Sequence, residues 1–155
     1  MQTYLEPTQD SGRAFFMRGI TGEVVMLNLL RFRAVADYST APELAPDEPI
    51  SGEAAYGLYM SHTLPHLEKS GGRLLFYGRG GPFLIGPNEE RWDAAMLVAQ
   101  SSAAAFLAFA SNAGYLAGIG HRTAALEDSR MFVHHGARSA QDRAFLELLP
   151  GSLDH

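Results

Sequence analysis

A small group of polar side chains stands within or beside apolar segments of this sequence, and their types suit one kind of chemistry. An amide, phenol hydroxyls, an imidazole and a guanidinium can together hold a small carbonyl or carboxylate compound and transfer a proton. The candidate catalytic residues are His62, the expected general base, and Tyr59. The candidate ligand-binding residues are Asn28, Tyr77, Arg122 and Asp128, of which Arg122 would balance an anion.

Asn28 is the most unusual member of this group. It interrupts the apolar run EVVMLNLLRFR, and a buried amide must find hydrogen-bond partners. Tyr77 is expected on the open face of the same sheet, where we place the pocket. Tyr59 and His62 are separated by about one helical turn and would border the pocket from a helix.

Each of these residues also has a structural interpretation. Tyr59 shares the apolar face of a helix with Tyr56, so it could pack there with its hydroxyl at the rim. Arg122 and Asp128 flank the start of an expected strand and could form an ion pair that ties it to the preceding loop. Trp92 is expected to pack in the core or in a dimer interface.

The glycine-rich stretch YGRGGPFLIGP, residues 77–87, has the composition of a phosphate-binding loop but not its pattern. A dinucleotide fingerprint needs a glycine where Phe83 stands and a helix where a strand follows. A P-loop needs a lysine and a hydroxyl where Pro87 and Asn88 stand. We therefore expect a turn between two strands.

The sequence lacks the residue patterns that metal binding and cysteine chemistry need. His62 and His66 have a metal-ligand spacing on an expected helix, but Pro65 lies between them and the glutamate of zinc hydrolases is missing. His134 and His135 would point to opposite faces of a strand. The chain has no cysteine, which excludes disulfides, thiolate metal sites and cysteine nucleophiles. We predict no metal and no cofactor.

Composition indicates one globular domain. The 155 residues are 46% hydrophobic and 19% charged, and the net charge of −5 argues against a nucleic-acid partner. The N-terminus lacks an apolar signal core, so we predict a cytoplasmic protein. The stretch 94–120 carries no charged residue or histidine, but its polar residues favour a buried strand and an Ala-rich helix over a membrane span.

The elements expected to position the candidate residues follow a split βαβ order. After a helix over 12–18, we predict strand 23–33, helix 51–70, strands 72–79 and 91–100, helix 101–115, strand 124–135 and a terminal helix over 139–149. This is the βαββαβ order of α+β ferredoxin-like domains with an antiparallel sheet. The single domain, 1–155, would comprise a helical extension over 1–22, the core over 23–135 and a helix and tail over 136–155.

The helix over 51–70 should turn one apolar face to the sheet, and Pro65 should kink or restart it. That face consists of Tyr56, Tyr59, Met60, Thr63, Leu64 and Leu67. The proline-rich loop over 34–52 is either a lid or a flexible insertion, and we favour the insertion.

The sheet should need a partner on its uncovered face. Both faces of strand 23–33 and of strand 91–100 are apolar, whereas a solvated face would alternate with polar residues. We therefore predict a homodimer that packs sheet on sheet through this open face.

Three runs of the sequence, spanning about residues 23 to 134, resemble domain-of-unknown-function family 1330. The matching features, in order, are Tyr56, Tyr59, Gly71, Gly72, Gly86, Trp92, Phe106, Tyr115 and Arg122. The family is similar to dimeric α+β barrel proteins, which include cofactor-free monooxygenases, lactone isomerases and haem-binding relatives. The resemblance implies the fold and the dimer and carries no accepted activity.

Two functions of different classes stay open from the sequence. The first is a cofactor-independent enzyme, of oxygenase or isomerase type, or a small-molecule binder, with a pocket between sheet and helices. The second is a non-catalytic dimeric binding or scaffold protein without a ligand-sized cavity. Haem binding, implied by the relatives of the family, is a more distant third.

Overall fold

A four-stranded antiparallel sheet, in the order β2-β3-β1-β4, forms the centre of the computed structural model. The structure describes residues 2–136, 144, 147–148 and 150–151. In chain order the elements are α1 (Gln9–Met17), β1 (Val24–Phe32), the 3-10 helix η1 (Pro42–Leu44), α2 (Gly52–Lys69), β2 (Arg73–Arg79), β3 (Ala94–Gln100), α3 (Ala103–Ala110), α4 (Ala113–Leu116), α5 (Ile119–Ala125) and β4 (Leu126–His135).

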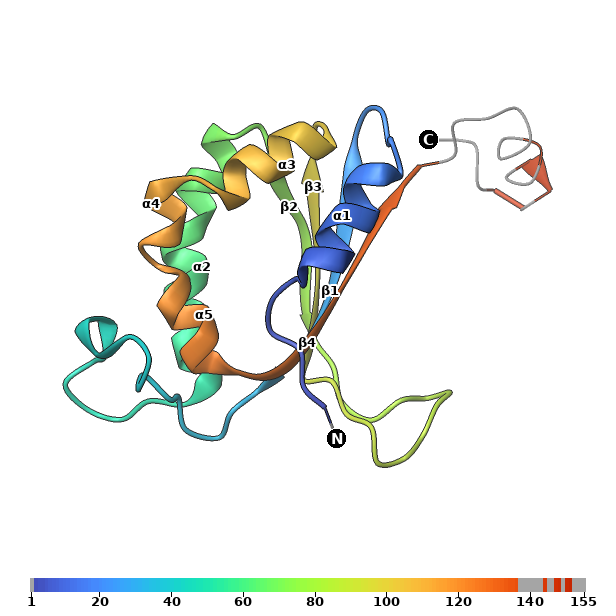
Figure 1. Ribbon diagram of the computed structural model, residues 1–155. Coiled ribbons are helices and arrows are strands. Elements are labelled where there is room, and N and C mark those ends of the chain that lie inside the picture. The colour runs from blue at the N-terminus through green and yellow to red at the C-terminus, as the bar shows by residue number, and fades with distance from the viewer. Residues whose placement is uncertain (1, 137–143, 145–146, 149, 152–155) are drawn as a thin grey trace.

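This strand order confirms the ferredoxin-like α+β fold, in which β1 and β3 are central and the other two strands form the edges. Helices α2 to α5 gather on one side of the sheet, as Figure 1 shows. The core lies between this helical layer and the covered face of the sheet. It includes Leu30 and Met96 from the strands and Tyr56 and Leu67 from α2.

Strand β1 is buried on one face and half-buried on the other. Every second residue from Val24 to Phe32 is buried, and the residues between them are intermediate. The alternation follows from the pleat, which turns successive side chains to opposite faces. The expectation that both faces are buried therefore holds for the helix-covered face alone within one chain.

Helix α2 matches the expectation closely. The Oγ of Ser51 accepts a hydrogen bond from the Ala54 N–H at 3.0 Å, which caps the helix start. Gly71 follows the helix with a φ of 90°, a left-handed conformation that other residues rarely adopt. Pro65 lies inside the helix without dividing it. The predicted apolar face does point to the core.

The single helix expected over 101–115 is instead two short helices, α3 and α4, and a third, α5, follows them. Ser102 caps α3, but α3 ends at Ala110 and Asn112 starts a new helix. The Oδ1 of Asn112 accepts a hydrogen bond from the Tyr115 N–H at 3.0 Å, so the asparagine caps α4. Helix α5 was not predicted, and it includes Ala124 and Ala125, where the last strand was expected to begin; β4 begins at Leu126.

The segments before and after the core differ from expectation in detail. Helix α1 begins at Gln9 rather than at residue 12, because Thr8 caps it and Ser11 completes a capping box with Thr8. The loop over 34–51 is anchored, because the Asp37 N–H donates to the Ala124 carbonyl at 2.9 Å. The terminal helix expected over 139–149 falls mostly outside the described residues.

The glycine-rich stretch is part of the connection from β2 to β3, as predicted. Strand β3 starts at Ala94 rather than at residue 91, and a single bridge between Pro82 and Arg91 closes the base of the connection. Leu84 is 99% and Ile85 91% exposed at its tip. The connection thus carries apolar side chains into solvent.

Within the part of the chain that is described, no single helix has the length and apolarity to cross a membrane. One bent pair of helices, Ala103–Ala110 with Ala113–Ala125, meets such a criterion by length and composition alone.

Candidate functional site

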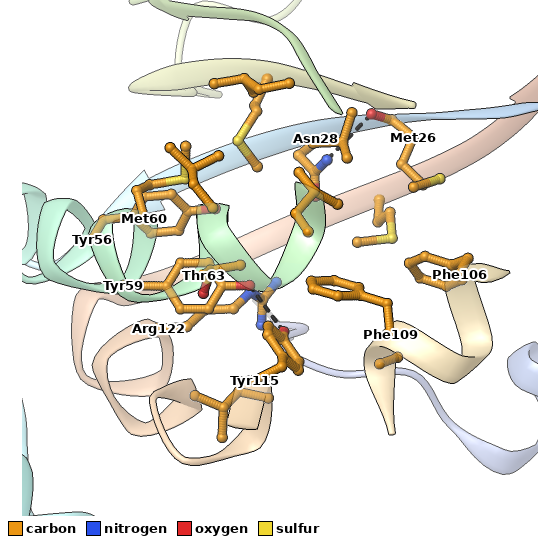
Figure 2. A pocket seen from close by; sticks show the side chains of 18 of the residues that line it. Met26, Asn28, Tyr56, Tyr59, Met60, Thr63, Phe106, Phe109, Tyr115 and Arg122 are labelled. Atoms are coloured by element: carbon orange, nitrogen blue, oxygen red, sulfur yellow. Dashed lines mark hydrogen bonds between the residues drawn. The ribbon is translucent and has the colours of Figure 1, made fainter. Parts of the chain in front are cut away.

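A cavity of about 350 Å³ lies between the sheet and the helical layer. Apolar side chains from β1, β3, α2 and α3 form most of its wall, and the N-terminal segment completes it (Figure 2). Its polar lining residues are Glu6, Asn28, Tyr56, Tyr59, Thr63, Tyr115 and Arg122. Three of the six predicted site residues, Asn28, Tyr59 and Arg122, therefore share one cavity.

Asn28 reaches this cavity from the sheet. Its side chain is 4% exposed, and its Nδ2 donates a hydrogen bond to the Met26 carbonyl at 3.3 Å. Among the described residues no donor is recorded for its Oδ1. The amide therefore presents an unused acceptor on an apolar wall, as the sequence led us to suspect.

Tyr59 and Tyr115 meet on the helical side of the cavity, where their hydroxyls share a hydrogen bond of 2.9 Å. Burial raises the pKa of Tyr59 well above the ordinary value, and the neighbouring Tyr115 adds to the increase. Burial also raises the pKa of Tyr56. These phenols consequently stay protonated near neutral pH and act as hydrogen-bond donors.

Arg122 lies beside the hydroxyls of Tyr59 and Tyr115 in Figure 2. Its guanidinium donates hydrogen bonds to the Leu5 carbonyl and to Ser129 Oγ, the latter at 3.4 Å. No described residue forms an ion pair with it. The pairing with Asp128 that the sequence offered as an alternative is therefore wrong.

Thr63 and Tyr115 belong to the cavity but were not among the predicted site residues. The Oγ1 of Thr63 is buried and has no hydrogen-bond partner within the described chain. Thr63 stood in the predicted apolar face of the helix as a polar residue, and this was the available signal. Tyr115 carried part of the family resemblance, but spacing alone gave no reason to place it opposite Tyr59.

His62 does not line the cavity, although it was the expected general base. Its Nε2 donates a hydrogen bond to the Gly114 carbonyl at 2.7 Å, and its ring packs against Gly118. Helix α2 therefore presents His62 to α4 and the turn before α5. The reason is helical phase: Tyr59 already lies at one margin of the cavity-facing stripe, and a further step of three residues turns His62 beyond that margin.

Tyr77 also lies outside the cavity lining, and it does not face the open side of the sheet. Its cross-strand partner is Met96, which lines the cavity, so Tyr77 belongs to the helix-covered face. The pairing register shifts between Leu74 and Phe76, and this irregularity reverses the alternation assumed from the sequence. Tyr77 is 38% exposed near the sheet edge.

Asp128 lies on the opposite face of the sheet from Arg122 and is fully buried. Its Oδ1 accepts hydrogen bonds from the Tyr4 N–H at 2.8 Å and from Arg130 at 2.7 Å. Burial alone would raise the pKa of Asp128, but these donors outweigh it and lower the pKa. Asp128 thus anchors the N-terminal segment and takes no part in the cavity.

Metal ligation has no support in the described residues, where no group of three or more histidine or acidic side chains could hold an ion. The rings of His62 and His66 lie 5.1 Å apart between centroids, with the first engaged by a carbonyl. The two histidines therefore serve packing between helices.

The fold and this cavity define a ferredoxin-like α+β protein with room for a small molecule beneath its helices. The chain belongs to the family of the RPA0582 protein of Rhodopseudomonas palustris, a protein of unknown function. It is 31% identical to the RPA0582 crystal structure, with a TM-score of 0.76, over 89% of this chain and 100% of that one.

A second structure of the same relative gives a similar match, and a more distant structure is less similar. A crystal structure of methylated RPA0582 protein is 30% identical, with a TM-score of 0.78 and coverage of 90% of this chain and 99% of that one. A Dabb family protein with a ferredoxin-like fold from Mesorhizobium loti is 10% identical, with a TM-score of 0.47 over 74% of this chain and 97% of that one. No protein-family model and no curated protein matches the chain.

Proposed function

We propose that this protein binds a small, largely apolar molecule in the cavity between the sheet and the helical layer. The observation that carries the proposal is the cavity itself, whose volume of about 350 Å³ falls within the usual range of ligand sites. Its apolar walls bear the buried Oγ1 of Thr63, which has no hydrogen-bond partner among the described residues, and the amide of Asn28, whose Nδ2 donates to the Met26 carbonyl and whose Oδ1 can accept from a ligand. Apolar walls with a few unused polar groups are typical of ligand sites.

The scaffold alternative is less well supported, because it predicts a filled interior. Turnover is not part of the proposal, since no imidazole lines the cavity among the described residues and Glu6, its one acidic lining residue, is exposed. We propose Asn28, Tyr59 and Arg122 as ligand contacts.

Native mass spectrometry of protein purified from its own host tests this proposal. We expect a small molecule to remain bound to the wild-type protein and to be lost from Ala110→Phe, because Ala110 lines the cavity and a phenyl ring there would fill it. Ala108→Phe is the matched control, since Ala108 is exposed on the same helix. A bound mass that persists in Ala110→Phe would place the ligand elsewhere and refute the proposal.

Haem does not fit this site. Neither histidine nor cysteine, the common axial ligands, lines the cavity within the described part of the chain. Tyr59 and Tyr115 could ligate iron as phenolates, but they are hydrogen bonded to each other and burial raises the pKa of Tyr59. The residues therefore favour an organic ligand without a metal ion.

We also propose that two copies of the chain associate through the face of the sheet that the helices leave open. Phe132 is 65% and Phe76 is 56% exposed, and their cross-strand partners Leu27 and Leu97 are half-buried. Large apolar side chains side by side on a sheet are typical of an interface. The exposed tip at Leu84 and Ile85 offers further apolar contact area.

We further propose that the chain is related to domain-of-unknown-function family 1330. Of the residues that carry that resemblance, five come together around the cavity: Tyr56, Tyr59, Phe106, Tyr115 and Arg122. Their convergence supports a shared site rather than scattered identities. A structure from that family with unrelated side chains at the corresponding positions would contradict this proposal.

A further inference from the structure

The cavity is polar at two opposite sides and apolar between them. Asn28 projects into it from β1, whereas Arg122, Tyr59 and Tyr115 lie across it on the helical side, as Figure 2 shows. The space between them is bounded by side chains such as Phe109. A ligand that fills the cavity therefore meets polar groups at both ends.

The helical side is a set of donors. In the pair formed by Tyr59 and Tyr115, one hydroxyl donates to the other, so one phenolic proton is left for a ligand. Arg122 has five N–H groups; it donates to the Leu5 carbonyl and to Ser129 Oγ, and it also interacts with the Tyr56 hydroxyl. This end of the cavity consequently suits an oxygen that accepts several hydrogen bonds.

The charge at this end favours an anion. Arg122 is partly buried and forms no ion pair with any described residue, and the buried carboxylate of Asp128 is engaged on the other face of the sheet. Tyr56 and Tyr59 stay neutral because burial raises the pKa of each. A partly buried cation without a counter-charge is stabilised when a ligand supplies one.

The sheet side has the opposite character. Because the Nδ2 of Asn28 donates to the Met26 carbonyl, the amide orientation is set and its Oδ1 is directed to accept. A ligand with an O–H or N–H group at this end would donate to the Oδ1 of Asn28, and a purely apolar end would forgo this hydrogen bond.

We infer that the ligand is a compact carboxylic acid with an apolar body and a hydroxyl or amino donor at its far end. The carboxylate binds Arg122 and the hydroxyl pair of Tyr59 and Tyr115, and the donor binds Asn28. This inference rests on the proposed binding function. It specifies the chemical class and the orientation that the proposed function leaves open.

Three probe compounds test the class of ligand: 4-hydroxyphenylacetate, 4-methylphenol, which lacks the carboxylate, and phenylacetate, which lacks the hydroxyl. Dissociation constants and the affected amide signals are measured by NMR titration. We expect 4-hydroxyphenylacetate to bind at least about tenfold more tightly than 4-methylphenol, since hydrogen bonds to charged groups are worth roughly that factor or more. Phenylacetate should be intermediate.

Variants test the orientation. Arg122→Gln should remove the advantage of the carboxylate and leave the affinity for 4-methylphenol unchanged. Asn28→Leu should remove the advantage of the hydroxyl and leave phenylacetate binding unchanged. Arg79→Gln is the control, because Arg79 is exposed and pairs with Glu53 away from the cavity. If Arg122→Gln does not fold, Arg122→Lys should retain part of the carboxylate advantage, because it keeps the charge and loses the fork geometry.

The outcomes separate two failures. Equal binding of 4-methylphenol and 4-hydroxyphenylacetate to the wild-type protein overturns the inference and leaves the binding function standing. The same holds if Arg122→Gln weakens all three probes equally, since Arg122 would then act on the fold through Leu5. Absence of any cavity shift with all three probes, together with host-purified protein that carries no ligand, overturns both.

Discussion

At the scale of single residues, the contact between His62 and Gly118 decides what this imidazole can do. A Cβ placed on Gly118 would overlap the ring of His62, although the backbone there, at a φ of −105°, accepts any residue. We expect Gly118→Ala to lower the free energy of unfolding by about 1–3 kcal/mol, the usual cost of overpacking. Urea denaturation measures this change.

A double-mutant cycle with His62→Ala supplies the control. If the cost of Gly118→Ala comes from the ring, it should largely disappear in the His62→Ala background. Gly57→Ala, at an exposed helical glycine with open space around it, should instead stabilise the protein by roughly 0.5–1 kcal/mol. Additive effects of the two substitutions at His62 and Gly118 would show that the ring does not pack there.

Part of the site could be predicted from a single residue whose chemistry does not suit its surroundings. Asn28 was identified because an amide within an apolar strand needs a partner, and this reasoning uses no tertiary information. Tyr77 was misplaced because a register shift in β2 cannot be seen in an alternating sequence. His62 was misplaced because its spacing from Tyr59 shows that the two side chains are neighbours on the helix. The spacing does not show which other element each side chain contacts.

At the scale of elements, the loop over 34–51 is joined to α5 by a titratable contact. The Tyr38 hydroxyl and Nδ1 of His121 share a hydrogen bond of 2.7 Å. Burial, and then the charge of His62, lower the pKa of His121 below 6.5. The unfolded chain therefore binds a proton more readily, so this stabilisation is complete above about pH 6.5 and is lost as the pH falls toward the lowered pKa.

We accordingly expect the urea midpoint to fall between about pH 7.5 and pH 5.5, and His121→Gln to reduce that dependence by removing the titrating group. His135→Gln, at an exposed position, should leave it unchanged. A midpoint that rises on acidification, or a dependence that persists fully in His121→Gln, would contradict the assignment.

Elements were predictable where local chemistry and burial agree. Strand β1 and helix α2 follow from apolar patterning and from a serine cap, and both were predicted nearly to their bounds. The Ala-rich run after β3 was not, because alanine favours helix at every position and hides the breaks. Asn112 was the signal for one break, since asparagine favours the start of a helix over its interior.

At the scale of the whole molecule, the open face of the sheet predicts the state of assembly. We expect light scattering at micromolar concentration to give twice the 16.8 kDa of one chain. Phe132→Asp should give the mass of one chain, because burying a phenyl ring contributes roughly 1.5–3 kcal/mol, and a two-fold interface contains each position twice.

Phe16→Asp is the control for this substitution. Phe16 is 68% exposed on α1, similar to the 65% of Phe132, but it does not belong to the sheet. It should leave the mass unchanged. A wild-type mass of one chain, or equal dissociation by both variants, would rule out association through this face.

The strand order of the whole molecule was predictable because element order constrains topology strongly. The involvement of the N-terminal segment in the cavity was not, since Leu5 and Arg122 are separated by 117 positions in the sequence. Contacts at such separation leave no periodic trace in either segment.

The anchoring of the N-terminal segment has a consequence for the protein during its synthesis on the ribosome. Tyr4 leaves the ribosome early, but its backbone partners, Asp128 and Ser129, are translated 124 and 125 residues later. The wall of the cavity formed by Leu5 and Glu6 therefore cannot close until β4 has emerged. Until then a nascent chain should expose the apolar interior, and ribosome-bound chains truncated before β4 should be the form that chaperones capture.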